Sequence, residues 1–254
     1  MGTAHVFDEK NTIKTASCER MIIGMNDGSV IWLRGLFGVR VYAGQVELGG
    51  CRLEPLASNQ YSRCAAPKYS SAMELHAVEN KDVKRKRLIL VDEEEIEAEG
   101  LARQLAQHFP VVVVLKALLI DYTNVDCFVS SPLGFQFILD TEEETTIPKA
   151  LDGWIARGGT PRRIASKPWA PVINAIVQQN RTPTTVVCGP KGAGKSTFAR
   201  YLVNATLPHT SVVAYLDTDV GQPEFTPSGM VSLHLLTQPI LGPAHTHMKI
   251  MSLR

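Results

Sequence analysis

The chain lacks the sequence features of secreted proteins, of proteins stabilised by a structural metal ion and of membrane-spanning proteins. Only five of its 254 residues are cysteines, and no two of them form a C-x-x-C pair. Neither a zinc site nor a disulfide framework is therefore expected. Residues 1–10 contain no hydrophobic core of signal-peptide length, and the most apolar stretch, residues 111–120, is too short to span a bilayer. We expect a reducing compartment inside the cell and no membrane partner.

Charge and repetition give little information about function. The formal net charge is +1 at pH 7, so any surface for nucleic acid must be local rather than spread over the chain. No internal repeat is visible. The basic run at residues 84–87 is typical either of a nuclear import signal or, more commonly, of a solvated surface patch.

The strongest feature that is present is the pattern G-x-x-x-x-G-K-[ST], which is typical of a phosphate-binding loop (P-loop). Its glycines let the backbone curl until several N–H groups point at one phosphate chain. Lys195 is predicted to bring a positive charge to the outer phosphates, and Ser196 to offer a hydroxyl to Mg²⁺. The predicted nucleotide-binding residues are Gly189, Pro190, Lys191, Gly192, Ala193, Gly194, Lys195, Ser196 and Thr197.

The segments on either side of the loop predict the elements that such a motif needs. Residues 185–188 are a short β-branched run and predict a buried strand. Residues 196–207 carry apolar side chains at helical spacing before Pro208, and predict a helix whose positive end faces the phosphates. Together they favour an α/β fold with a parallel sheet of the P-loop NTPase type.

Two acids follow the next predicted strand, residues 211–216. In a P-loop site, a carboxylate at the carboxyl end of a strand lies beside the bound Mg²⁺. Asp217 and Asp219 are two residues apart, so one can hold the metal's water shell while the other accepts a proton from an attacking hydroxyl. The alternative is that one of them only caps a turn, because Asp is common in turns.

The first part of the chain is predicted to be rich in β-structure. Residues 21–23 and 30–33 flank Asn26-Asp27-Gly28, a strong turn signal. Further short strands are predicted at residues 39–42 and 45–48, and strands so closely spaced favour a small sandwich or barrel.

A polar region with one helix interrupts this part. The helix is predicted at residues 93–109, with Ile96, Leu101, Leu105 and Phe109 on its apolar side. We predict two domains: residues 1–160, β-rich with this polar, partly helical insertion, and residues 161–254, the P-loop kinase domain. A short helix at residues 171–177 is expected to lead into the P-loop.

Several segments around these motifs resemble one kinase family. They are the P-loop, residues 215–229, residues 231–235 and residues 239–243. Their sequences are similar to those of the polynucleotide 5′-hydroxyl-kinase family of eukaryotic RNA processing, and closest to its nucleolar branch, which acts on ribosomal RNA precursors. The similarity covers about residues 184–245, while the β-rich start resembles the family's N-terminal domain more loosely.

The resemblance implies transfer of the γ-phosphate of ATP to the 5′-hydroxyl of RNA during pre-ribosomal RNA processing, in the nucleus and nucleolus. It implies Lys195, Asp217 and Asp219 as catalytic residues, with Asp219 as the candidate base, and Ser196 and Asp217 as Mg²⁺ ligands. Gln222, Thr226 and Pro227 would belong to a clasp on the terminal nucleotide. The implied partners are a 5′-hydroxyl RNA end and an RNA-processing endonuclease.

Other interpretations remain open. In the family, arginines of a lid well downstream of the clasp close on the transferred phosphate. A chain ending at Arg254 is therefore expected to have an incomplete sheet and no lid. A non-catalytic protein that binds ATP or a partner, or an inactive fragment, is the main alternative. A GTPase is disfavoured, since Asn80-Lys81-Asp82 precedes the loop and no N-K-x-D motif follows it.

Overall fold

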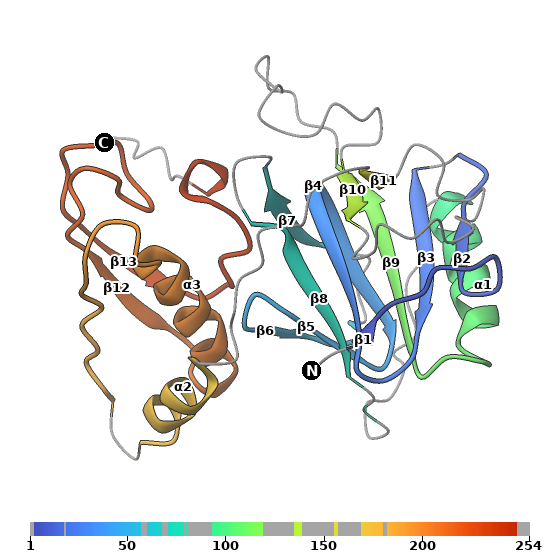
Figure 1. Cartoon of the computed structure of the whole chain (residues 1–254), viewed down its shortest axis with the longest axis horizontal. Coiled ribbons are helices and arrows are strands. Elements are labelled where there is room, and N and C mark those ends of the chain that lie inside the picture. The colour runs from blue at the N-terminus through green and yellow to red at the C-terminus, as the bar shows by residue number, and fades with distance from the viewer. Residues whose placement is uncertain are drawn as a thin grey trace. The chain divides into compact units, whose positions relative to one another are not determined.

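The structure is a computed structural model that describes residues 3–17, 19–56, 60–67, 71–78, 80, 93–118, 135–138, 155–156, 169–179 and 182–247. The chain divides into two compact units, one of Met1–Leu48 and Arg52–Ile164, the other of Gly49–Cys51 and Ala165–Arg254. Figure 1 shows the elements of both. The basic run at residues 84–87 lies outside the described residues.

The first unit is built on β4 (Ser29–Ala43), a strand of 15 residues of which nearly all are buried. Five strands pair with it, and the whole sheet has eleven strands, so the β-rich start is confirmed. The strands that pair with β4 are β1 (Thr3–Ala4), β7 (Ser62–Ala66), β8 (Met73–Val78), β9 (Val111–Ala117) and β10 (Phe135–Ile138). The others are β2 (Thr12–Lys14), β3 (Arg20–Met25), β5 (Gln45–Leu48), β6 (Cys51–Leu53) and β11 (Ile155–Ala156).

The turn at residues 26–28 forms, but the strands on either side of it do not pair with each other. The N–H of Ser29 donates to the carbonyl of Asn26 at 3.1 Å, and Gly28 has a φ of 73°. β9 lies between β3 and β4 and pairs antiparallel with both. Its run of valines is fully buried, and so apolar a strand gains most from a central place in the sheet.

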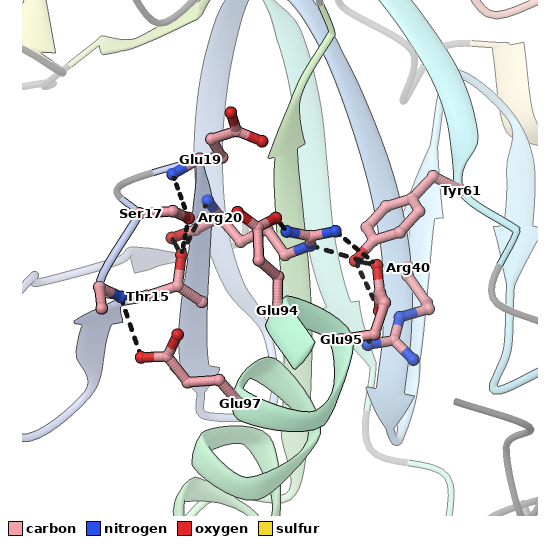
Figure 2. Close-up of polar contacts among 10 residues, drawn as sticks. Thr15, Ser17, Glu19, Arg20, Arg40, Tyr61, Glu94, Glu95 and Glu97 are labelled. Carbon is pink, nitrogen blue, oxygen red and sulfur yellow. Dashed lines mark hydrogen bonds and ion pairs between the residues drawn. The ribbon is translucent and has the colours of Figure 1, made fainter. Parts of the chain in front are cut away.

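Helix α1 (Glu93–Leu105) covers part of this sheet. The predicted helix is confirmed, but the predicted apolar side is wrong at Ile96, which is 55% exposed. Leu105 is buried as predicted, and the other buried positions are Glu95, Ala98 and Ala102. Figure 2 shows why: Glu95 reaches two arginines of the sheet, Arg20 at 3.0 Å and Arg40 at 3.2 Å. Ion pairs, and not the largest apolar side chains, decide which face of α1 is buried.

The described residues of the second unit form two α-helices, a pair of strands and two short 3₁₀ helices. They are α2 (Ala170–Val177), α3 (Lys195–Thr206), η4 (Leu207–His209), β12 (Val213–Asp217), β13 (Ser232–Leu236) and η5 (Ala244–Thr246). The core is formed by Val203 of α3, Phe225, Leu236 and Ile240. Trp169, just before α2, meets the rings of Phe198 and Tyr201 on α3 edge-on. The predicted helices at residues 171–177 and 196–207 are therefore confirmed.

The predicted parallel sheet is wrong for the strands that the structure describes here. β12 and β13 pair antiparallel, with Tyr215 opposite His234. Residues 185–188 form no strand, and the side chain of Val186 is 81% exposed. A β-branched run favours extended backbone, but it becomes a strand only beside a partner, and β13 is the only described partner of β12. No helix in the described part of the chain is long and apolar enough to cross a membrane.

Candidate functional site: a phosphate-binding loop and an acidic turn

The P-loop has the backbone that its glycines predict. Gly189, Gly192 and Gly194 have φ values of 154°, 80° and 86°, in the region that side chains with a Cβ rarely adopt. A Cβ placed on Gly192 or Gly194 would meet no atom within 4 Å. These two glycines are therefore required by the backbone conformation and not by crowding. Gly194 is also the N-cap residue, directly before the first residue of helix α3.

Lys195 and Ser196 are the first residues of α3 after that glycine. The ammonium group of Lys195 donates to the carbonyl of Pro190 at 3.1 Å, so its side chain folds back over the loop. Ser196 is exposed, which leaves its hydroxyl accessible. The first N–H groups of a helix have no partner within the helix and carry partial positive charge. Loop, lysine and helix end thus bring several donors together within residues 189–196, as an anion requires.

Asp217, the last residue of β12, holds the chain that follows it. Its carboxylate is 5% exposed. Oδ1 accepts the N–H of Asp219 at 3.1 Å, and Oδ2 accepts the N–H of Glu224 at 2.6 Å. Because both oxygens are engaged by the backbone, Asp217 organises residues 217–229, which we call the acidic turn.

Asp219 lies at the exposed end of the same turn. Its Oδ1 accepts the N–H groups of Gly221 at 3.1 Å and Gln222 at 3.0 Å. Within the described parts of the chain no hydrogen-bond donor contacts Oδ2. Asp219 therefore has one oxygen that fixes its orientation and a second that is open to a metal ion or to a hydroxyl group.

The predicted clasp residues occupy two different environments. Gln222 and Pro227 are exposed, whereas Thr226 is 2% exposed and its hydroxyl has no hydrogen-bond partner within the described residues. The turn is closed by Gly229, whose N–H donates to the carbonyl of Val220 at 2.7 Å. In this conformation Gln222 and Pro227 are accessible to a ligand and Thr226 is not.

One residue of this site was missed by sequence reasoning. Glu224 is 3% exposed, and its Oε1 accepts the Nε–H of Arg200 at 2.7 Å and lies 2.8 Å from Nε2 of His247. Burial alone would raise the pKa of Glu224, but the contacts with His247 and Arg200 outweigh it and hold the pKa below its ordinary value. The available signal was an acid placed directly between two apolar residues, Pro223 and Phe225.

The oxygen groups here are of the kind that Mg²⁺ prefers, a hydroxyl and carboxylates. Ser196 offers an exposed hydroxyl, and Asp219 offers an uncommitted oxygen. Each oxygen of Asp217 already accepts one backbone N–H, so Asp217 could bind the ion only through the remaining lone pairs of a carboxylate whose position is fixed. When bound, the ion would neutralise charge on the phosphates.

Comparison with known proteins identifies the same region. Residues 189–253 match the family described as mRNA cleavage and polyadenylation factor CLP1 P-loop. The polynucleotide 5′-hydroxyl-kinase NOL9 of Danio rerio is 44% identical over 101 residues, which are 39% of this chain and 14% of that protein. The polynucleotide 5′-hydroxyl-kinase grc3 of Schizosaccharomyces pombe is 50% identical over 66 residues, 26% of this chain and 9% of that protein.

A human relative and a solved structure complete the comparison. Human polynucleotide 5′-hydroxyl-kinase NOL9 is 51% identical over 67 residues, 26% of this chain and 10% of that protein. A chain from a solved Clp1p–Pcf11p complex has a TM-score of 0.41 and 15% identity, covering 87% of this chain and 37% of its own length; a similarity of that level supports no conclusion about the fold. The chain thus matches about a tenth of the length of these curated relatives. Its P-loop segment thus matches a CLP1 P-loop family and is similar to the polynucleotide 5′-hydroxyl-kinases NOL9 and grc3, the family that its sequence predicted.

Proposed function

We propose that this chain is part of an ATP-dependent polynucleotide 5′-hydroxyl kinase that acts on RNA in pre-ribosomal RNA processing. The observation that carries the proposal is the P-loop backbone, with three glycines at positive φ before a helix that starts with Lys195. The family of this segment and the names of its relatives support ATP as the phosphate donor and a 5′-hydroxyl end as the acceptor. The resemblance seen in the sequence also motivates a nuclear and nucleolar location and an RNA-processing endonuclease as partner. We divide the protein functionally at residue 160, with the kinase part at residues 161–254.

The residues have distinct roles in this reaction. The P-loop N–H groups and Lys195 bind the phosphates, and Ser196 holds the Mg²⁺ that accompanies ATP. Phosphoryl transfer needs alignment and neutralisation of charge more than covalent help. The protein's main task is therefore to hold the γ-phosphate in line with the acceptor oxygen.

The different contacts of Asp217 and Asp219 give these two acids different roles. Asp219 orients the 5′-hydroxyl and accepts its proton through Oδ2, while Asp217 keeps the acidic turn in place through its two backbone contacts. Gln222 and Pro227, which are exposed beside Asp219, contact the terminal nucleotide. Thr226 supports the clasp from inside.

The test is transfer of labelled γ-phosphate from ATP to a short oligoribonucleotide with a 5′-hydroxyl. The control is the same oligonucleotide with a 5′-phosphate, which offers no acceptor. Label on the first and not on the second supports the kinase. ATP binding with no transfer to either would instead support the non-catalytic alternative, and the kinase assignment would be withdrawn.

A further inference from the structure

A buried ion pair connects the P-loop helix to the acidic turn. Arg200 lies on α3, in the same helix as Lys195. Its Nε–H donates to Oε1 of Glu224 at 2.7 Å. The side chain of Glu224 is 4% exposed and that of Arg200 is 25% exposed, so the carboxylate is held inside the unit while the arginine reaches it from the helix.

The main chain of Glu224 continues this connection to both aspartates. Its N–H donates to Asp217 at 2.6 Å, and the other oxygen of Asp217 accepts the N–H of Asp219 at 3.1 Å. A contiguous series of contacts therefore runs from α3 through Arg200, Glu224 and Asp217 to the backbone of Asp219.

The surroundings of Glu224 restrict its movement. Phe225, the next residue, packs against the rings of Tyr215, His234 and His247 at centroid distances of 5.3, 4.5 and 5.3 Å. A charged pair in such a place loses hydration, and a packed apolar pair would hold the unit together at least as well. The ion pair instead fixes the position of the Glu224 carboxylate, because a guanidinium binds a carboxylate in a defined geometry.

We infer that Glu224, held by Arg200, is a positioning residue that sets Asp219 relative to the P-loop helix. Its catalytic consequence rests on the proposed kinase function, but its structural consequence does not. The nucleotide-binding end of α3 and the acid that meets the acceptor are then fixed as one piece, so the two halves of the reaction are aligned before substrate arrives.

Amide hydrogen exchange in the full chain tests the structural part without any need for activity. Arg200→Met and Glu224→Gln should each speed exchange at the Asp219 and Glu224 N–H groups about tenfold or more, while the α3 amides change about twofold or less. Arg200→Lys, which keeps the charge, should restore part of the protection and remains informative if Arg200→Met does not fold. Gln238→Ala, at an exposed position after β13, is the control. Unchanged protection of the acidic turn in both variants overturns the inference.

Transfer kinetics test the catalytic part. Glu224→Gln should lower kcat about tenfold and leave the KM for ATP within about twofold. In the Asp219→Asn background the same change should cost less than about twofold more, since the group that it positions is already gone. Losses that multiply in the double variant contradict a positioning role. If the wild-type chain transfers no phosphate, the proposed function fails, and hydrogen exchange alone still decides the inference.

Discussion

Removing the Glu95 carboxylate should destabilise the first unit more than removing any neighbouring acid of helix α1. Glu95 bridges two arginines that are almost completely buried, Arg20 and Arg40, and it also accepts the hydroxyl of Tyr61 at 3.1 Å. Figure 2 shows the three donors converging on this one carboxylate. In Glu95→Ala, Arg20 keeps its ion pair with Glu94, but Arg40 is left with Glu99 at 3.6 Å.

The expected cost follows from the desolvated charges. Removing one partner of a buried ion pair lowers the free energy of unfolding by about 3–5 kcal/mol, because the remaining charge stays buried without a partner. Glu97→Ala is the matched control: Glu97 is on the same helix and accepts the N–H of Ala16 at 2.9 Å at an exposed contact, so its loss should cost about 1 kcal/mol or less.

Native-state hydrogen exchange at the β3 and β9 amides, followed against urea, measures the free energy of opening of this unit alone. A Glu95→Leu variant that also carries Arg20→Met and Arg40→Met should recover most of the loss, since the three charges that pair with one another are removed together. If Glu95→Ala costs no more than Glu97→Ala, the ion-pair account of how α1 is placed is wrong.

The other predictions concern single groups. Lys195→Ala should weaken Mg·ATP binding about a hundredfold or more in a fluorescent-nucleotide titration, with circular dichroism unchanged, because the loop loses its point charge; an unchanged affinity would mean that the nucleotide site is elsewhere. Burial lowers the pKa of His5 to about 4 from 6.5, against the opposing effects of Asp8 and Asn11. The unfolded chain therefore binds more protons between these values, and the first unit should lose up to about 3 kcal/mol as the pH falls from 6.5 to 4; His5→Gln should flatten this part of a urea-midpoint profile, and an unflattened profile would assign the effect to other groups. Thr226→Val should be neutral or raise the free energy of unfolding by about 1 kcal/mol, because it replaces a buried hydroxyl that has no partner in the described part of the chain; a loss of transfer activity with unchanged stability would return Thr226 to the substrate site.

Local sequence patterns predicted where helices and strands form better than they predicted which elements pack or pair with each other. The helices α1, α2 and α3 and the strand β12 follow from composition and spacing over short stretches. The buried face of α1 does not, since it depends on Arg20, 75 positions away from Glu95. The run at residues 185–188 failed for the same reason: β-branched side chains favour extended backbone, but pairing needs a neighbour that the run itself does not specify.

In the candidate site, too, local features could be predicted and long-range contacts could not. The backbone conformation of the P-loop could be predicted, because it depends on the glycines of the loop itself. The roles of Asp217 and Asp219 could not be separated, since the difference lies in where the N–H groups of Asp219, Gly221, Gln222 and Glu224 point. The ion pair of Glu224 with Arg200 joins positions 24 apart, which no local pattern reveals.

The division of labour between the two aspartates is the central claim about chemistry, and one paired measurement tests it most directly. Mg·ATP affinity, phosphate transfer to a 5′-hydroxyl oligoribonucleotide and exchange of the acidic-turn amides are measured on the same samples of Asp219→Asn and Asp217→Asn. Asp219→Asn should lower the transfer rate about a hundredfold or more, with ATP affinity and amide protection retained. Asp217→Asn should speed amide exchange throughout residues 217–224 as well as slowing transfer. Near-normal transfer by Asp219→Asn, or an undisturbed turn in Asp217→Asn, would contradict the account.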